Sequence, residues 1–368
     1  MKKHLIKTLA VIVVLSATIG LVACGGATPP PAPPQVAPPG DGAAPAADLP
    51  SYNFIWGTPF GGTHHILLGI IEPLIEEIYE KSNGRIVINV IAGGGLVTAA
   101  SAVDDVIMGS VDFAWTMPGS TPGRFLLSEM LEFSGHFGSG VEATNTFWDV
   151  FEVNQYLQAE HGDYKLLAFF TTEPGEIYNS VRPVRTPEDT AGLLIRTPSP
   201  MVERTLQAYG ASSVNMPSGD VYDAADRGIV DGTGTPHSGV VSFSFYEVFQ
   251  YATDGLNLYV SPHMFVMSWD AWNRLHPYDQ ALLEEITERS RGLSLRAAAQ
   301  YDRFSAEGLV YLETIDSLTI HRLTDEERLA FYTAAIPVVD AHIANVEAQG
   351  LPARDVYNAF IAARNAQR

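Results

Sequence analysis

Arg196 is the residue whose type and position best suit it to hold a ligand. It follows the apolar run Leu193–Ile195, which is typical of a buried strand, so its side chain stands where that strand passes into a loop. A guanidinium offers a planar fork of N–H donors that pairs with both oxygens of a carboxylate and stays charged away from water. The residue by itself also allows a surface arginine or an arginine in an internal ion pair.

Tryptophans offer apolar surface for the rest of a ligand. Trp56 lies at the end of the first predicted strand and Trp115 at the end of the third. A flat side chain at a strand end can pack on the apolar part of a bound molecule. Each is equally compatible with a place in the core, and Trp269 and Trp272, at a helix start, favour the core.

The sequence holds no motif for covalent catalysis. There is no G-x-S-x-G elbow, no H-E-x-x-H pair and no P-loop. His64 and His65 are adjacent and so point in different directions, and His237-Ser238 lacks a third member for a nucleophilic triad. We therefore expect no catalytic residues, no metal and no cofactor.

Strands and helices alternate from residue 51 onward. The predicted strands are 52–57, 85–91, 111–116, 166–171, 193–197, 212–215, 229–231, 256–261 and 264–268, and the predicted helices among them are 65–79, 98–108, 200–209 and 217–227. This alternation predicts mostly parallel sheets covered by helices. Because it runs twice, with strands crossing between the halves, we predict an α/β fold with two lobes, a hinge and a ligand cleft between the lobes.

Helices dominate the C-terminal part of the chain. One long helical pattern runs from Pro277 to about Leu312. Thr324–Glu327 forms a capping box that opens another helix, and Gly350–Pro352 interrupts the helical tail.

Composition narrows the class of protein further. The chain has 368 residues, a net charge of −20 and 46% hydrophobic residues, which is ample for two medium lobes. So acidic a chain is a poor partner for nucleic acid. A single cysteine excludes a disulfide framework.

A family resemblance rests on the stretch from Arg182 to Gly239. It contains Pro187–Pro198 (PEDTAGLLIRTP) and Pro217–Gly232 (PSGDVYDAADRGIVDG), with similar features at Ser82–Arg85 and Gly109–Ala114. These segments resemble the substrate-binding proteins of tripartite ATP-independent periplasmic (TRAP) transporters, the DctP-like family. The resemblance covers most of residues 51–340 in the expected order.

The resemblance implies a fold and a role. It implies a two-lobed, periplasmic-binding-protein-like fold with a long helix spanning both lobes, with lobe I at 51–172 and about 261–300 and lobe II at 173–260 and about 301–368. It also implies that Arg196 binds a ligand carboxylate and that the closed protein delivers its ligand to TRAP membrane subunits. Uptake through those subunits would be powered by an ion gradient.

The sequence departs from the family near the expected site. Where many members carry a second arginine, this chain has Glu176, with Glu173 close by, and Thr235 stands where an asparagine often contacts ligand. One arginine with one or two carboxylates suits a monocarboxylate that bears a donor or a cationic group, although both glutamates are equally compatible with solvent exposure. The predicted ligand-binding set is Arg196, Trp115, Thr235, Glu176, Glu173, Trp56 and Ser218.

The first fifty residues predict export and anchoring rather than fold. Basic residues precede the apolar run Leu9–Val22, and Leu21–Cys24 resembles the lipobox of bacterial lipoproteins. We expect a signal peptide at 1–23, a lipidated Cys24 and a proline-rich tether to residue 50, with the body held outside the cytoplasmic membrane. Two alternatives remain open from the sequence: the ligand-binding module of a sensor system, and a secreted enzyme.

Overall fold

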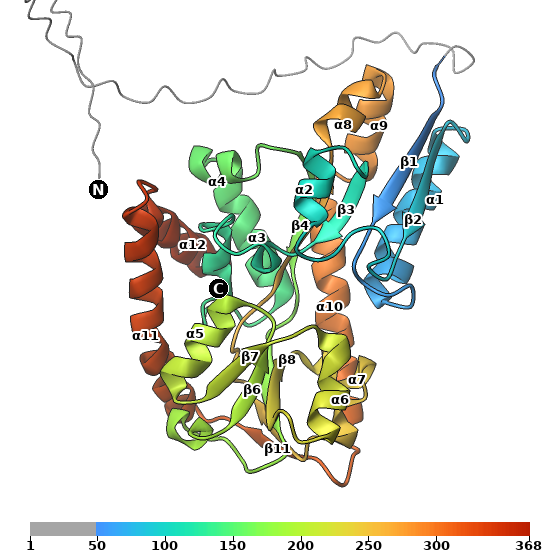
Figure 1. Ribbon diagram of the computed structural model, residues 1–368. Coiled ribbons are helices and arrows are strands. Elements are labelled where there is room, and N and C mark those ends of the chain that lie inside the picture. The colour runs from blue at the N-terminus through green and yellow to red at the C-terminus, as the bar shows by residue number, and fades with distance from the viewer. Residues whose placement is uncertain (1–48) are drawn as a thin grey trace, which may run out of the picture. The chain divides into compact units, whose positions relative to one another are not determined.

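The computed structural model describes residues 49–368, and the predicted signal peptide, Cys24 and almost all of the tether lie outside them. The strands form two sheets (Figure 1). The first has the order β2-β1-β3-β10-β4, with β1 (Tyr52–Gly57), β2 (Ile86–Ile91), β3 (Phe113–Thr116), β4 (Lys165–Thr171) and β10 (Pro262–Met267). The second has the order β11-β9-β5-β8-β6-β7, with β5 (Glu176–Asn179), β6 (Leu194–Thr197), β7 (Ser212–Asn215), β8 (Gly232–Thr235), β9 (Tyr251–Asp254) and β11 (Thr319–Arg322). The two-lobed α/β fold is therefore confirmed.

The sheets are mixed, whereas the sequence predicts mostly parallel ones. β1 pairs in parallel with β2 and β3, and β6 with β7 and β8. β10 runs antiparallel to β3 and β4, and β5 runs antiparallel to β8 and β9. The reason is that the chain enters β5 and β10 from the other sheet, so each of these strands arrives from the opposite direction.

Two extended segments cross between the sheets side by side. Residues 172–175 follow β4, and residues 255–261 follow β9. Two backbone hydrogen bonds join them: Thr172 N donates to the Ser261 oxygen (2.9 Å), and Gly175 N donates to the Tyr259 oxygen (2.7 Å). The predicted strand 256–261 is thus mostly this crossing, and the paired segments form the hinge that joins the lobes.

The long helical pattern is broken into two helices. α9 (Pro277–Ile286) ends before Glu288, Arg289 and Ser290, which have positive φ angles of 49°, 54° and 70°. α10 (Arg291–Leu312) then contacts β4 and α3 (Gly140–Phe151) in the first lobe and α7 (His237–Ser242) in the second. The prediction of one helix from Pro277 is wrong at this break, and the prediction of a helix spanning both lobes is confirmed.

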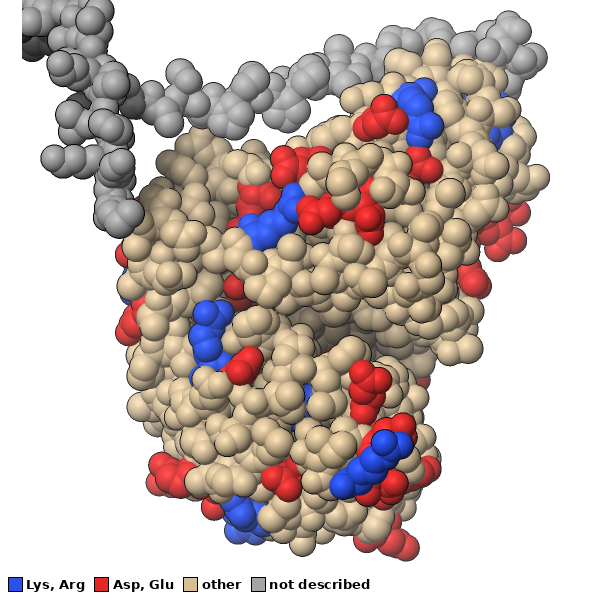
Figure 2. Space-filling model, viewed as in Figure 1, with Lys and Arg blue, Asp and Glu red and all other residues tan. Residues whose placement is uncertain are grey.

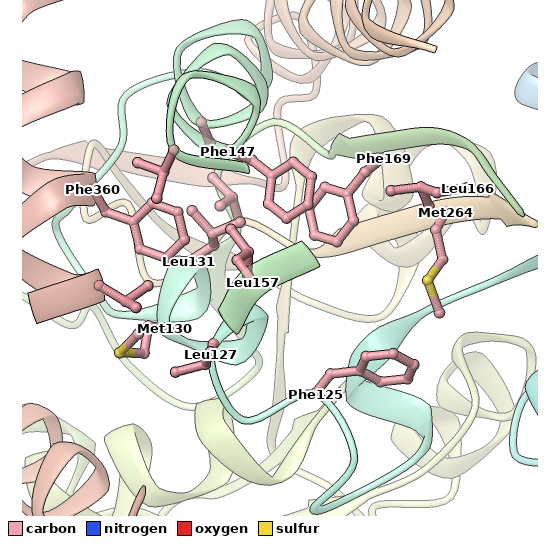
Figure 3. Packing of buried hydrophobic residues seen from close by; sticks show 14 of the residues in the cluster. Phe125, Leu127, Met130, Leu131, Phe147, Leu157, Leu166, Phe169, Met264 and Phe360 are labelled. Carbon is pink, nitrogen blue, oxygen red and sulfur yellow. The ribbon is translucent and has the colours of Figure 1, made fainter. Parts of the chain in front are cut away.

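The C-terminal helices join the lobes on another side of the molecule. α11 (Asp325–Glu347) opens with the predicted capping box, contacts α5 (Pro200–Tyr209) and adds Phe331 to the second lobe's core. It is long and apolar enough to cross a membrane, but its last turns pack in the core of the first lobe. The sequence assigns 301–368 to lobe II, yet α12 (Ala353–Gln367) packs against α3, and Phe360 belongs to the same hydrophobic cluster as Phe147 and Leu131 (Figure 3).

Shorter elements complete the lobes. The first lobe contains η2 (Leu67–Ile71), α1 (Glu72–Lys81), α2 (Ala102–Ile107), η3 (Pro118–Ser120), η4 (Ser128–Glu132), α4 (Gln155–Glu160) and α8 (Trp269–Arg274). The second contains η5 (Pro187–Thr190), η6 (Ser218–Asp220), α6 (Val221–Asp226) and η7 (Phe245–Glu247). The carboxyl ends of β3 and β6 lead directly into η3 and α5, and these connections form the facing walls of the region described next.

Candidate functional site

Arg196 lies on β6 and is buried. β7 and β8 flank it, opposite Val214 and Thr233, and only 4% of its surface is exposed. Its Nε donates to the Met216 oxygen (2.8 Å) and its Nη2 donates to Ser218 Oγ (3.0 Å). These two bonds orient the guanidinium but supply no negative charge.

A comparison with Arg85 shows how unusual this arrangement is. Arg85 is also buried, and it donates to both oxygens of Asp279, at 2.9 and 2.6 Å. Among residues 49–368 no carboxylate lies within ion-pair distance of Arg196. Burial lowers the pKa of Arg196, because desolvation penalises its charge. A buried, unpaired guanidinium is costly, and an anion entering from outside would offset that cost.

Tyr259 is close enough to Arg196 and to two buried carboxyl groups for them to affect its pKa. It lies on a crossing segment, its hydroxyl donates to the Gly234 oxygen (3.3 Å) and its ring covers Gly175. Burial raises the pKa of Tyr259, Arg196 opposes that rise, and Glu132 and Glu173 add to it. Arg196 and both glutamates therefore lie within electrostatic range of one phenol at the hinge.

Glu173 has an unused oxygen at the hinge. Its Oε1 accepts from the Ser238 backbone N–H (3.3 Å), and its buried Oε2 has no partner among the described residues. Burial raises the pKa of Glu173 to about 8, with the Ser238 bond opposing the rise. The group is thus mainly uncharged at neutral pH and can donate one hydrogen bond as well as accept.

Glu176 is placed differently from its neighbour Glu173. Its carboxyl oxygens accept from the backbone N–H groups of Leu256 (2.9 Å) and Asn257 (3.2 Å). Burial raises its pKa well above the ordinary value. These bonds hold the turn that leads from β9 into the crossing segment. Thr235, directly opposite Glu176 on β8, is buried at that strand's end.

Both candidate tryptophans are fully buried. Trp115 donates from Nε1 to His263 Nδ1 (3.0 Å) and packs on Phe60, with ring centroids 3.9 Å apart. Trp56 stacks on Phe113, with centroids 5.3 Å apart, and its Nε1 has no partner among the described residues. In this structure both rings therefore serve the first lobe's core, with Trp115 nearer to the loop that follows β1.

Glu132 and Ser199 meet beside this site, and neither was among the predicted site residues. Glu132 ends η4 in the first lobe, and Ser199 precedes α5, three residues after Arg196. Ser199 Oγ donates to Glu132 Oε2. No local motif marks such a pair, because its members are 67 residues apart in sequence.

A hollow between the two lobes opens on one face of the molecule (Figure 2). Two other hollows lie elsewhere, one along α1 and β2 and one between α11 and α12. The second contains Arg354, but that arginine already contacts Asp340 (3.1 Å). No group of three or more potential metal ligands was found within residues 49–368.

Known proteins share this sequence pattern and architecture. The family model described as "bacterial extracellular solute-binding protein, family 7" (DctP) matches residues 61–345. The ectoine-binding periplasmic protein TeaA of Halomonas elongata is 27% identical over 300 residues, covering 77% of this chain and 84% of TeaA. The 2,3-diketo-L-gulonate-binding periplasmic protein YiaO of Escherichia coli is 23% identical, covering 77% of this chain and 84% of YiaO.

Crystal structures of TRAP solute-binding proteins share the fold. One from Bordetella bronchiseptica, with bound mandelate, has a TM-score of 0.77 at 24% identity, covering 86% of this chain and 100% of its own. One from a marine metagenome, with 3-hydroxybenzoate, has a TM-score of 0.79 at 24% identity, covering 86% and 99%. These likenesses show a shared fold. The family match over most of the folded body shows that the chain belongs to the DctP family of bacterial extracellular solute-binding proteins.

Proposed function

We propose that this protein captures a small organic acid outside the cytoplasmic membrane and delivers it to the membrane subunits of a TRAP transporter. The observation that carries the proposal is the buried Arg196, which has two orienting bonds and no carboxylate partner among the described residues. The ligand's carboxylate would take the place of that partner. Closure of the lobes about the crossing segments would then remove the ion pair from water.

The second half of the ligand is expected to carry a polar group. Glu173 lies at the hinge, and its buried Oε2 has no partner in the described part of the chain. Its carboxyl group can accept from an ammonium or hydroxyl group or donate to a hydroxyl or carbonyl oxygen. A monocarboxylate with one such group fits this pairing better than a dicarboxylate does. The bound mandelate and 3-hydroxybenzoate of the structural relatives are acids of this kind, which supports the class but does not identify this chain's ligand.

A thermal-shift screen tests the site. The panel holds matched hydroxy and amino acids, such as mandelate with phenylglycine and 3-hydroxybenzoate with 3-aminobenzoate, together with succinate as a dicarboxylate. A ligand at 100 times its Kd stabilises the folded protein by about 2.7 kcal/mol, a shift of several degrees at most.

Arg196→Ala should weaken binding of the active compound by about 2–5 kcal/mol, or roughly thirtyfold to several thousandfold. Arg196→Lys should recover only part of that loss, because an ammonium lacks the planar fork. Arg227→Ala is the matched control, since Arg227 lies in the same lobe but is exposed and paired with Asp223 (3.9 Å). If Arg196→Ala binds the compound with unchanged affinity, the assignment of the site is wrong. If no acid in the panel raises the Tm of ligand-free protein, the proposed ligand class is wrong.

Membrane attachment through Cys24 is a separate part of the proposal and rests on the lipobox-like sequence alone. Labelled palmitate should be incorporated into the native chain, and Cys24→Ser should abolish labelling and release the protein from the membrane fraction. A native chain that carries no label would contradict the anchor without affecting the ligand site.

A further inference from the structure

The segment that follows the Arg196 strand is tied to the opposite lobe through Glu132 and Ser199. Farther along α5, the Tyr209 hydroxyl and Ser134 Oγ make a second contact between the lobes (2.8 Å). We infer that Glu132 is a positioning residue: through Ser199 it holds the Arg196–Ser199 segment of the second lobe against the first lobe and so favours the closed arrangement. The link to ligand binding rests on the function proposed above. The contact itself can be tested without any ligand.

Close packing around the pair supports this role. Glu132 is 2% exposed and Ser199 is 4% exposed. Gly119 of η3, directly after β3, packs against both, because a Cβ there would lie 2.9 Å from Glu132 Oε1 and 3.1 Å from the Ser199 Cβ. Ser199 also accepts from Val202 N as the N-cap of α5. The pair therefore connects the end of the first lobe's β3 with the helix that follows Arg196.

The protonation state of Glu132 decides how much free energy its burial in this contact costs. Burial raises the pKa of Glu132 to about 8, Glu129 on the same turn adds to the rise, and Ser199 and the α5 residue Arg204 oppose it. Tyr259 faces it from the crossing segment. Farther out, Glu160 on α4 faces Glu129, and His342 on α11 faces Arg204. No ion pair to Glu132 is present among the described residues, so its neutral form suits this site.

Closure is consequently coupled to proton uptake. When the lobes separate, water reaches Glu132 and its pKa returns toward the ordinary value near 4.5. The closed form then binds more protons than the open form between about pH 4.5 and 8, so closure weakens as pH rises. One such proton changes the closing equilibrium by up to about tenfold for each pH unit.

Fluorescence energy transfer across the lobes measures this in the ligand-free protein. Labels are attached at Met108→Cys in the first lobe and Ile229→Cys in the second, both exposed positions, in a chain carrying Cys24→Ser. The closed fraction should fall between pH 6 and pH 8. Glu132→Gln should remove the part of this pH dependence that comes from one proton. The closed fraction of the variant should therefore stay near the value that the native chain has at pH 6.

Glu160→Gln is the matched control. Glu160 is a buried glutamate whose pKa burial raises to about 7, but its partners, Leu127 N and Ser128, belong to the first lobe alone. This variant should keep the pH slope of the native chain. Gly119→Ala gives a second test, because the added methyl group separates Glu132 from Ser199 and should lower the closed fraction at every pH, whereas Gly62→Ala, which meets nothing within 4 Å, should not.

A Glu132→Gln profile that follows the native one, or a native closed fraction that does not change with pH, would overturn the inference. Neither result would bear on Arg196, because no ligand is present. Conversely, loss of pH dependence in Glu132→Gln would support the inference even if no acid in the panel bound.

Discussion

At the scale of single residues, the two buried arginines Arg85 and Arg196 affect the stability of the fold in opposite directions. Arg85 makes a bidentate ion pair with the fully buried Asp279, so its charge is neutralised within the fold. Within residues 49–368, Arg196 has only a carbonyl and a hydroxyl as partners. Breaking a buried ion pair is expensive, whereas removing a buried charge that lacks a partner relieves a cost. Arg85 therefore stabilises the fold, whereas Arg196 lowers its stability, as the proposed ligand site requires.

Replacing each arginine by methionine tests that contrast. Arg85→Met should lower the free energy of unfolding by about 3–5 kcal/mol, because it leaves the Asp279 carboxylate buried and unpaired. Arg196→Met should leave the ligand-free protein as stable as the native chain, or stabilise it by up to about 2 kcal/mol. Urea unfolding of the three proteins gives the comparison. A large loss of stability in Arg196→Met would mean that this arginine is structural.

At the scale of elements, the start of α10 fixes the helix that joins the lobes. Ser290 Oγ donates to the Leu166 oxygen (2.9 Å), and Ser294 Oγ accepts from Phe169 N (2.9 Å) while donating to the Ser290 oxygen (2.6 Å). The register of β4 against β10 shifts at the same place, between Phe265 and Val266. Because β4 is the edge strand of its sheet, the two serines supply partners for backbone groups of Leu166 and Phe169 at this edge.

Ser294→Ala measures how much the junction between α10 and β4 contributes to the free energy of unfolding. It leaves the Phe169 amide buried without an acceptor, so we expect a loss of about 1–3 kcal/mol in the free energy of unfolding. Ser305→Ala, on the same helix, has no side-chain bond among the described residues and should change stability by less than about 0.5 kcal/mol. Equal effects of the two substitutions in urea unfolding would contradict this account of the junction.

At the scale of the whole molecule, buried titratable groups divide into two sets. Burial lowers the pKa of His64, His161 and His263 to about 3, and that of His65 and His136 to about 4. Burial raises the pKa of Glu132 and Glu173 to about 8 and that of Glu160 to about 7. Both sets are held uncharged by the fold, and they respond to pH in opposite directions.

The stability of the protein should therefore pass through a maximum at mildly acidic pH. Below pH 6.5 the unfolded chain protonates its histidines while the folded chain does not, so stability falls as pH drops toward 3. Above pH 4.5 the unfolded chain ionises its glutamates, so stability falls as pH rises toward 8. We expect the highest Tm between about pH 4.5 and 6.5 and a clear decline by pH 8. A Tm that rises steadily from pH 6 to 8 would contradict the balance.

Local signals in the sequence determined the elements and the family. α5 and β7 begin and end where predicted, because Ser199, Pro200 and Gly210 specify a helix start and stop through bonds to their own neighbours. Arg196 was recognisable as a strand-end arginine, and the capping box at Thr324 formed as predicted. Such features depend on residues a few positions apart, which a single sequence displays directly.

Tertiary structure alone decided which polar groups have partners. The sequence left open whether Arg196 is paired, and it treated Glu173 and Glu176 alike, although Glu176 holds a turn 80 residues away and Glu173 keeps a free oxygen. It also gave no sign of the bond between Glu132 and Ser199, or of the left-handed residues that divide α9 from α10. The charge state and role of a buried group depend on what the fold brings beside it, and that information is spread over distant parts of the chain.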